Sequence, residues 1–155
     1  MSELLVALVG MGKMGRALAA LAPERGVRVV AELDPARAGY TGITRDSLRG
    51  AQVAIEFTTP DAAPANARAC AAAGCPVVVG TTGWYDQLPA VAAEVERAGG
   101  AILTAPNFSV GVAVFDRVVA EAARLFAHLD GFDAHLVETH HAAKKDAPSG
   151  TGRGR

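Results

Sequence analysis

The sequence predicts an α/β fold built on a doubly wound parallel sheet. Short apolar runs such as LLVALV at 4–9 are typical of strands that are buried on both faces. These runs alternate with Ala-rich stretches of helical length, and each connection between them is short. Because crossovers between parallel strands are right-handed, this alternation favours one sheet with helices on both faces.

The first half of the chain supplies three of the expected strands. A glycine turn follows the strand at 4–9, and a helix is expected from Met14 until Pro23 and Gly26 end it. The apolar runs VRVVAEL at 27–33 and AQVAIEF at 51–57 are the second and third strands. Asp61 is expected to cap an Ala-rich helix that runs to residue 73.

The second half continues the same alternation. PVVVG at 76–80 is the fourth strand, and a helix is expected from Trp84 to Ala98, with a break near its start at Pro89. The fifth strand, AILTA at 101–105, follows a Gly-Gly pair. A long helix is then expected over 110–128, and FDAHLVETHH at 132–141 is a sixth extended segment.

Composition narrows the class of protein. The 155 residues fit one domain, and half of them are hydrophobic, which is enough for a sizeable core. A net charge of -1 without like-charge blocks suggests neither a nucleic-acid nor a membrane partner. The N-terminus lacks the basic start of a signal peptide, and no apolar run approaches the ~20 residues of a membrane span. Cys70 and Cys75 are expected to be buried thiols, and the protein is expected to be cytoplasmic.

A G-x-G-x-x-G motif stands between the first strand and the first helix. In this context it predicts a Rossmann-type dinucleotide site, where Gly10 allows the tight turn and Gly12 lets the backbone approach a pyrophosphate. Gly15 would let the helix pack close to the strand, and the free N–H groups of the helix would face the phosphates. A strand–turn–helix without a ligand is the alternative. Lys13 and Arg16 are either phosphate contacts or surface residues.

Two acids mark the end of the second strand. Glu32 and Asp34 lie on the same side of that strand, and Asp34, at its tip, is the better candidate for the adenosine ribose hydroxyls. A carboxylate at this position favours NAD over NADP, because it repels a 2′-phosphate. Arg37 lies near enough to weaken that preference.

Three further strand ends are small and polar: EFTTP at 56–60, GTTGW at 80–84 and APNFS at 105–109. Because ligands of this fold bind at the carboxyl ends of the strands, these turns are expected to line one crevice. Each turn alone is also explained as an ordinary turn or helix cap, but three in succession favour a site. The candidate lining residues are Thr58, Gly80, Thr81, Thr82, Gly83, Asn107 and Ser109.

The stretch ETHHAAKKDAPSGT at 138–151 concentrates proton-transfer and anion-binding groups. His140 and His141 end an extended segment and point in opposite directions, and Lys144 follows in a polar loop. A histidine and a lysine together can move a proton and keep a site positive toward an anion. The next turn would be a helix N-terminus suited to a carboxylate, formed by Ser149, Gly150 and Thr151. A solvated loop is the alternative, and no metal is expected, because no acid or third histidine completes a shell.

These motifs together resemble the 4-hydroxy-tetrahydrodipicolinate reductase family, also called the dihydrodipicolinate reductase family, of bacterial lysine and diaminopimelate biosynthesis. The family pattern E-x-H-H-x-x-K-x-D-A-P-S-G-T matches 138–151, and GMGKMGR, EFT, GTTGW and APNFSVGV match in the family's order. The resemblance, from about Val6 to Thr151, implies an oxidoreductase that moves hydride from NADH or NADPH to a cyclic dicarboxylate imine-type substrate. It implies a homotetramer for full-length members.

The resemblance also implies roles for individual residues. His140 matches the proton donor, and Lys144 matches the lysine that assists protonation. The implied substrate-binding residues are His141, Ser149, Gly150 and Thr151. The implied cofactor-binding residues are Gly10, Gly12, Lys13, Met14, Gly15, Asp34, Gly80, Thr82, Ala105, Asn107 and Phe108.

The sequence departs from the family pattern after Thr151. Family members continue into a helix and a mixed sheet, whereas GRGR at 152–155 is a poor helix start, because each glycine costs ~1 kcal/mol relative to alanine. We therefore expect 1–131 to be the dinucleotide-binding domain and 132–155 to be the first strand and active-site loop of a truncated substrate domain. An active reductase and a truncated, non-catalytic NAD(P)-binding fragment remain the two main hypotheses. A different small dehydrogenase is a third, against which the DAPSGT match argues.

Overall fold

The computed structural model describes residues 3–133, 135 and 137–139, and the chain divides after Ala105 into two compact units. The first unit holds a five-stranded parallel sheet with the strand order β2-β1-β3-β4-β5. The strands are β1 (Leu4–Val9), β2 (Val27–Leu33), β3 (Val53–Glu56), β4 (Val77–Val79) and β5 (Ile102–Thr104). The predicted doubly wound parallel sheet is therefore confirmed.

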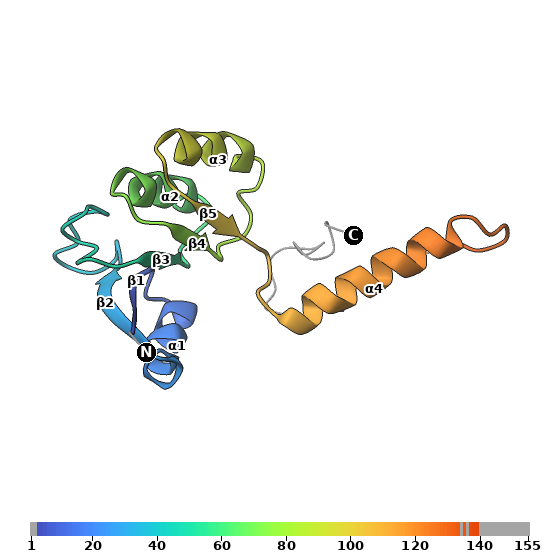
Figure 1. Ribbon diagram of the computed structural model, residues 1–155, viewed down its shortest axis with the longest axis horizontal. Helices are drawn as coiled ribbons and strands as arrows, with labels where there is room; N and C mark the ends of the chain where they lie inside the picture. Colours follow the sequence, from blue (N-terminus) through green and yellow to red (C-terminus); the bar gives the residue numbers. More distant parts are fainter. Residues whose placement is uncertain (1–2, 134, 136, 140–155) are drawn as a thin grey trace. The chain divides into compact units, whose positions relative to one another are not determined.

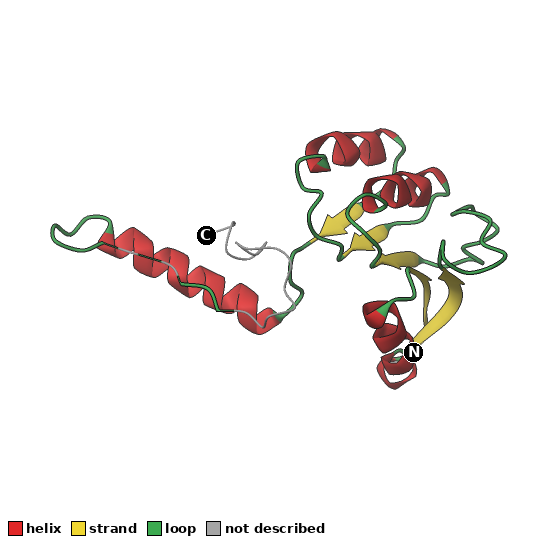
Figure 2. Ribbon diagram, turned by 180° about the vertical axis from the view of Figure 1, so that it is seen from behind, coloured by secondary structure: helices red, strands yellow, loops and turns green. Residues whose placement is uncertain are grey.

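Helices cover both faces of this sheet. In Figure 1, α1 (Lys13–Leu21) lies on one face, and α2 (Ala63–Ala72) and α3 (Leu88–Arg97) lie together on the other; Figure 2 shows the same layers from behind. A short 3-10 turn, η1 (Pro23–Arg25), links α1 to β2. The connection from β2 to β3, residues 34–52, contains no helix and runs through turns.

The alternation of side chains along β1 divides the core between the two faces. Val6 and Leu8 pack with Met11, and Leu18 of α1 covers them. Val9 points to the opposite face and belongs to the larger cluster under α2 and α3. The strand is buried on both faces, which is why its sequence is a continuous apolar run.

Two predicted helix starts are wrong. Ala62, and not Asp61, is the N-cap of α2, and no side chain caps it. The helix α3 begins at Leu88 instead of Trp84, because Pro89 occupies its first turn, where a missing N–H costs no hydrogen bond. Trp84 is a core residue, 1% exposed, and its Nε1 donates to the Thr81 carbonyl at 2.8 Å.

The second unit begins at Pro106 and contains α4 (Val110–Phe126). Ser109 caps this helix, because its hydroxyl oxygen accepts a 3.4 Å hydrogen bond from the Val112 N–H. No strand is assigned to the described residues of 132–139, so a strand there is not confirmed. The predicted domain boundary between 131 and 132 falls inside this unit and stays a prediction. None of the helices in the described part of the chain combines the length and apolar character of a membrane span.

Candidate functional site

The sheet has a topological switch point between β1 and β3. The chain leaves β1 for β2 on one side and later returns to β3 on the other side. Two connections that start at neighbouring strand ends therefore diverge, and the crevice between them is where open α/β sheets bind ligands. The glycine loop follows β1 and the turn at 57–60 follows β3, so both lie at this point.

The three glycines of the motif have different surroundings. Gly10 has a φ of +92°, and a Cβ there would lie 2.1 Å from the Phe57 carbonyl oxygen. A Cβ on Gly15 would lie 2.0 Å from the Gly10 carbonyl oxygen. A Cβ on Gly12 would meet no heavy atom within 4 Å. Packing therefore accounts for Gly10 and Gly15, whereas Gly12 faces open space that a ligand can fill.

A cavity of about 370 Å³ opens beside Gly12. It brings together the start of α1, the turn after β3 and the turn after β4, which the sequence placed in separate motifs. Its lining residues are Gly12, Lys13, Met14, Phe57, Thr58, Pro60, Gly80, Thr81 and Thr82. The Phe57 ring packs on Gly80, since a Cβ there would lie 2.1 Å from that ring. Packing by this ring therefore accounts for Gly80 without a ligand.

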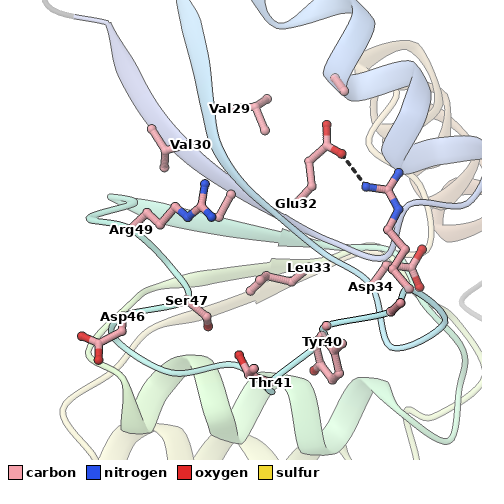
Figure 3. A pocket seen from close by; sticks show the side chains of 15 residues that line it. Val29, Val30, Glu32, Leu33, Asp34, Tyr40, Thr41, Asp46, Ser47 and Arg49 are labelled. Atoms are coloured by element: carbon pink, nitrogen blue, oxygen red, sulfur yellow. Dashed lines mark hydrogen bonds and ion pairs between the residues drawn. The ribbon is translucent and has the colours of Figure 1, made fainter.

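A second cavity, of about 700 Å³, lies along β2 and the loop that follows it (Figure 3). Asp34 is one of its lining residues and joins β2 to the glycine loop, because its Oδ2 accepts from the Met11 N–H at 3.1 Å. Its Oδ1 accepts from the Ala36 N–H at 3.0 Å. The nearby guanidinium of Arg37 donates to Glu32 Oε2 at 2.9 Å, the dashed contact in Figure 3. Both acids of ELDP are thus engaged, each with a different partner.

Sequence reasoning missed Glu56, the last residue of β3. Its side chain is 0% exposed, although it stands beside the switch point. Its Oε1 accepts from the Thr58 N–H at 3.1 Å, from the Thr58 hydroxyl and from Asn66 Nδ2 at 3.3 Å. The signal available in the sequence was a lone acid inside the apolar run AQVAIEF.

The two cysteines are buried free thiols, as expected. Burial, with smaller contributions from Cys75 and Glu56, raises the pKa of Cys70 to about 12. Burial also raises the pKa of Cys75. Because the thiolate is the reactive form, neither residue is suited to nucleophilic or redox chemistry near neutral pH.

The remaining predicted residues are spread over the rest of the chain. Ala105 ends the first unit, while Asn107 and Phe108 belong to the second, where the Asn107 Oδ1 accepts from the Ser109 N–H at 2.7 Å. The Phe108 residue is 48% exposed. The predicted catalytic and substrate-binding residues His140, His141, Lys144, Ser149, Gly150 and Thr151 lie outside the described residues. Within the described part of the chain, no group of three or more histidines, cysteines or acids could hold a metal ion.

The parallel sheet and the glycine loop at its switch point place the first unit in the Rossmann-type class of α/β proteins. The chain belongs to the dihydrodipicolinate reductase family. The family's N-terminal model, "Dihydrodipicolinate reductase, N-terminus", matches residues 4–108, and its C-terminal model matches 111–154. The resemblance to this family that the sequence motifs indicate is therefore confirmed.

Individual relatives carry the same name. The 4-hydroxy-tetrahydrodipicolinate reductase of Thiobacillus denitrificans is 39% identical over an alignment of 169 positions, which covers 96% of this chain and 62% of the relative. The reductase of Beutenbergia cavernae is 43% identical over 151 residues, which cover 94% of this chain and 57% of the relative. A dipicolinate-bound dihydrodipicolinate reductase from Paenisporosarcina sp. TG-14 has a TM-score of 0.73 at 27% identity, over 98% of this chain and 63% of that one. The chain thus spans about three fifths of the length of these relatives.

Proposed function

We propose that the chain binds a nicotinamide dinucleotide at the β1/β3 switch point and forms part of an NAD(P)H-dependent reductase. The reaction is the reduction of 4-hydroxy-tetrahydrodipicolinate to tetrahydrodipicolinate in lysine and diaminopimelate biosynthesis. The observation that carries the cofactor site is Gly12, which has open space beside a cavity and no packing reason to be glycine. Family membership supports the reaction.

The residues around the two cavities fit a dinucleotide. Gly12, Lys13 and Met14 would hold the pyrophosphate, because they form the N-terminal start of α1, whose free N–H groups and dipole favour anions. Asp34 would hold the adenosine ribose, and Gly80 and Thr82, which line the cavity beside Gly12, would face the nicotinamide. The further cofactor-binding residues that we propose are Gly10, Gly15, Ala105, Asn107 and Phe108. When bound, the nicotinamide supplies the hydride.

The surroundings of β2 favour NADH over NADPH. Asp34 and Glu32 both line the cavity along β2, and two carboxylates beside the adenosine ribose would repel the 2′-phosphate of NADPH. Arg37, the cation that would relieve this repulsion, is paired with Glu32 instead. The side chains of Arg37 and Glu32 are 53% and 40% exposed, so solvent screens their ion pair. Holding Arg37 away from a 2′-phosphate should therefore weaken NADPH binding only modestly.

The substrate side of the reaction is assigned to the HHxxK…SGT stretch. His140 would donate the proton, with Lys144 assisting, and His141, Ser149, Gly150 and Thr151 would hold the carboxylates. The C-terminal family model includes all six positions, which supports this assignment. The whole reductase is proposed to act on this small dicarboxylate as a homotetramer, with no metal in the chemistry.

Binding and turnover are tested on the same sample. The single tryptophan, Trp84, contacts Thr81 of the cavity, so quenching of its emission should report NADH binding. Failure of the chain to bind NADH would refute the cofactor site. Oxidation of NADH with freshly generated cyclic imine then separates a reductase from the alternative, a fragment that binds NAD(P) without turnover.

A further inference from the structure

Glu56 is a buried acid that the proposed reaction does not use. It ends the central strand β3, where it lies opposite Val9 of β1 and Val79 of β4. A carboxyl group enclosed by apolar strands loses its hydration, and this loss is unfavourable unless other groups compensate for it. A buried carboxyl group at this position therefore needs a nearby cation or hydrogen-bond donors.

Among the described residues, Glu56 is compensated by hydrogen-bond donors and not by a cation. No ion pair between described residues involves Glu56, and its Oε2 has no hydrogen-bond partner there. All of its described hydrogen bonds go instead to Oε1, from Thr58 and Asn66. The carboxylate is thus used to hold one neighbouring turn and not to neutralise a charge.

The contacts around Oε1 form a closed network. Asn66 Nδ2 donates to the Thr58 hydroxyl at 3.1 Å as well as to Glu56. The Thr58 N–H is shared between Glu56 Oε1 and the Thr81 hydroxyl oxygen, which lies at 2.8 Å. The strand β3, the helix α2 and the turn after β4 are therefore tied together at Thr58.

This network ends at the cavity beside Gly12. Thr58 and Thr81 both line that cavity, whereas Glu56 does not. Gly10 packs closely against the same turn, because a Cβ at this position would lie 2.1 Å from the Phe57 carbonyl oxygen and 2.8 Å from Thr58 Cγ2. A shift of Thr58 would consequently reach both the cavity wall and the glycine loop.

We propose that Glu56 is a positioning residue of the cofactor cavity. It acts through Thr58. Its carboxylate holds the turn after β3 in position, and that turn forms part of the cavity wall and packs against the glycine loop. The inference rests on the proposed cofactor site and adds to it a residue that never touches the cofactor.

The test compares the affinity for NADH with the stability of the fold. Glu56→Leu removes every acceptor atom, while Glu56→Gln keeps an amide oxygen that can accept from the same donors. The control is Val95→Ala on α3, a core substitution at a residue that is 1% exposed and does not line the cavity. Each variant is unfolded by denaturant and titrated with NADH through Trp84 emission.

We expect Glu56→Leu to weaken NADH binding about tenfold or more, because the charged acceptor that anchors the turn is lost. Glu56→Gln should stay within about threefold of the unaltered chain and so rescue the function. Val95→Ala should lower stability and leave the NADH affinity within about twofold. The inference is overturned if Glu56→Leu binds NADH normally, or if Val95→Ala loses as much affinity at equal stability.

Thr58→Val keeps the inference testable if Glu56→Leu does not fold. It replaces the hydroxyl with a methyl group, leaves Glu56 in place, and should weaken NADH binding about threefold to fivefold. Unchanged affinity in this variant counts against the network. If the unaltered chain binds no NADH, the proposed function fails and this inference fails with it; normal binding together with unaffected variants overturns this inference alone.

Discussion

Replacing Gly12 by alanine separates the needs of the ligand from the needs of the fold. The added methyl group would meet no heavy atom within 4 Å, and the residue has a φ of -71°, which alanine adopts freely. Gly12 is the N-cap of α1, where alanine is less favourable than glycine by up to about 1 kcal/mol. We therefore expect Gly12→Ala to fold, with its free energy of unfolding lowered by no more than about 1 kcal/mol.

Cofactor binding should respond quite differently. The methyl group occupies the space through which the backbone approaches the pyrophosphate, so NADH binding should weaken at least about tenfold, which corresponds to about 1.4 kcal/mol. The matched variant is Gly15→Ala, whose Cβ would lie 2.0 Å from the Gly10 carbonyl oxygen. Overpacking of this kind costs about 1–3 kcal/mol and should lower stability in the absence of any cofactor.

Two measurements decide the matter: denaturant unfolding without cofactor, and NADH titration followed through Trp84. Gly12→Ala should lose affinity and keep its stability, and Gly15→Ala should lose stability first. Normal NADH affinity in Gly12→Ala would show that the open space beside this residue is not the phosphate site. A large loss of stability in the same variant would show that a packing requirement at Gly12 has been overlooked.

Three other predictions concern different parts of the chain. Glu32→Gln should release Arg37 and raise NADPH affinity about twofold to fivefold, the size of an exposed ion pair, with NADH affinity nearly unchanged in parallel titrations. Because the pKa of Cys70 is raised in the folded protein, the unfolded chain loses the thiol proton at a lower pH than the folded protein does. The free energy of unfolding should therefore fall as the pH rises from the ordinary thiol pKa toward about 12, and should be unaffected by this thiol at lower pH. Cys70→Ala should reduce this alkaline loss in unfolding experiments, and an unchanged pH profile would contradict the assignment. In a full-length reductase that carries this segment, His140→Gln and Lys144→Ala should each remove most turnover without altering NADH binding, and retained rates would disprove their roles.

Much of the fold was predictable because its signals are local. The apolar run of β2 gave the strand's bounds at Val27 and Leu33, and that of β1 did so at Leu4 and Val9. The error at Trp84 arose where two local signals competed. At Trp84, the proline five residues later set the helix start, and the aromatic ring was needed in the core.

The sequence by itself determined the order of strands and helices, the family motifs and the glycine loop, because these depend on neighbours along the chain. Only the tertiary structure decided which glycine faces open space and which acid serves which partner. Asp34 reaches the Met11 N–H across 23 positions, and Thr58 reaches Thr81 across another 23. Such contacts depend on the strand order β2-β1-β3-β4, which brings distant turns together at one edge of the sheet. For the same reason Glu56 is an acid in an apolar run in the sequence, and the support of a cavity wall only in the fold.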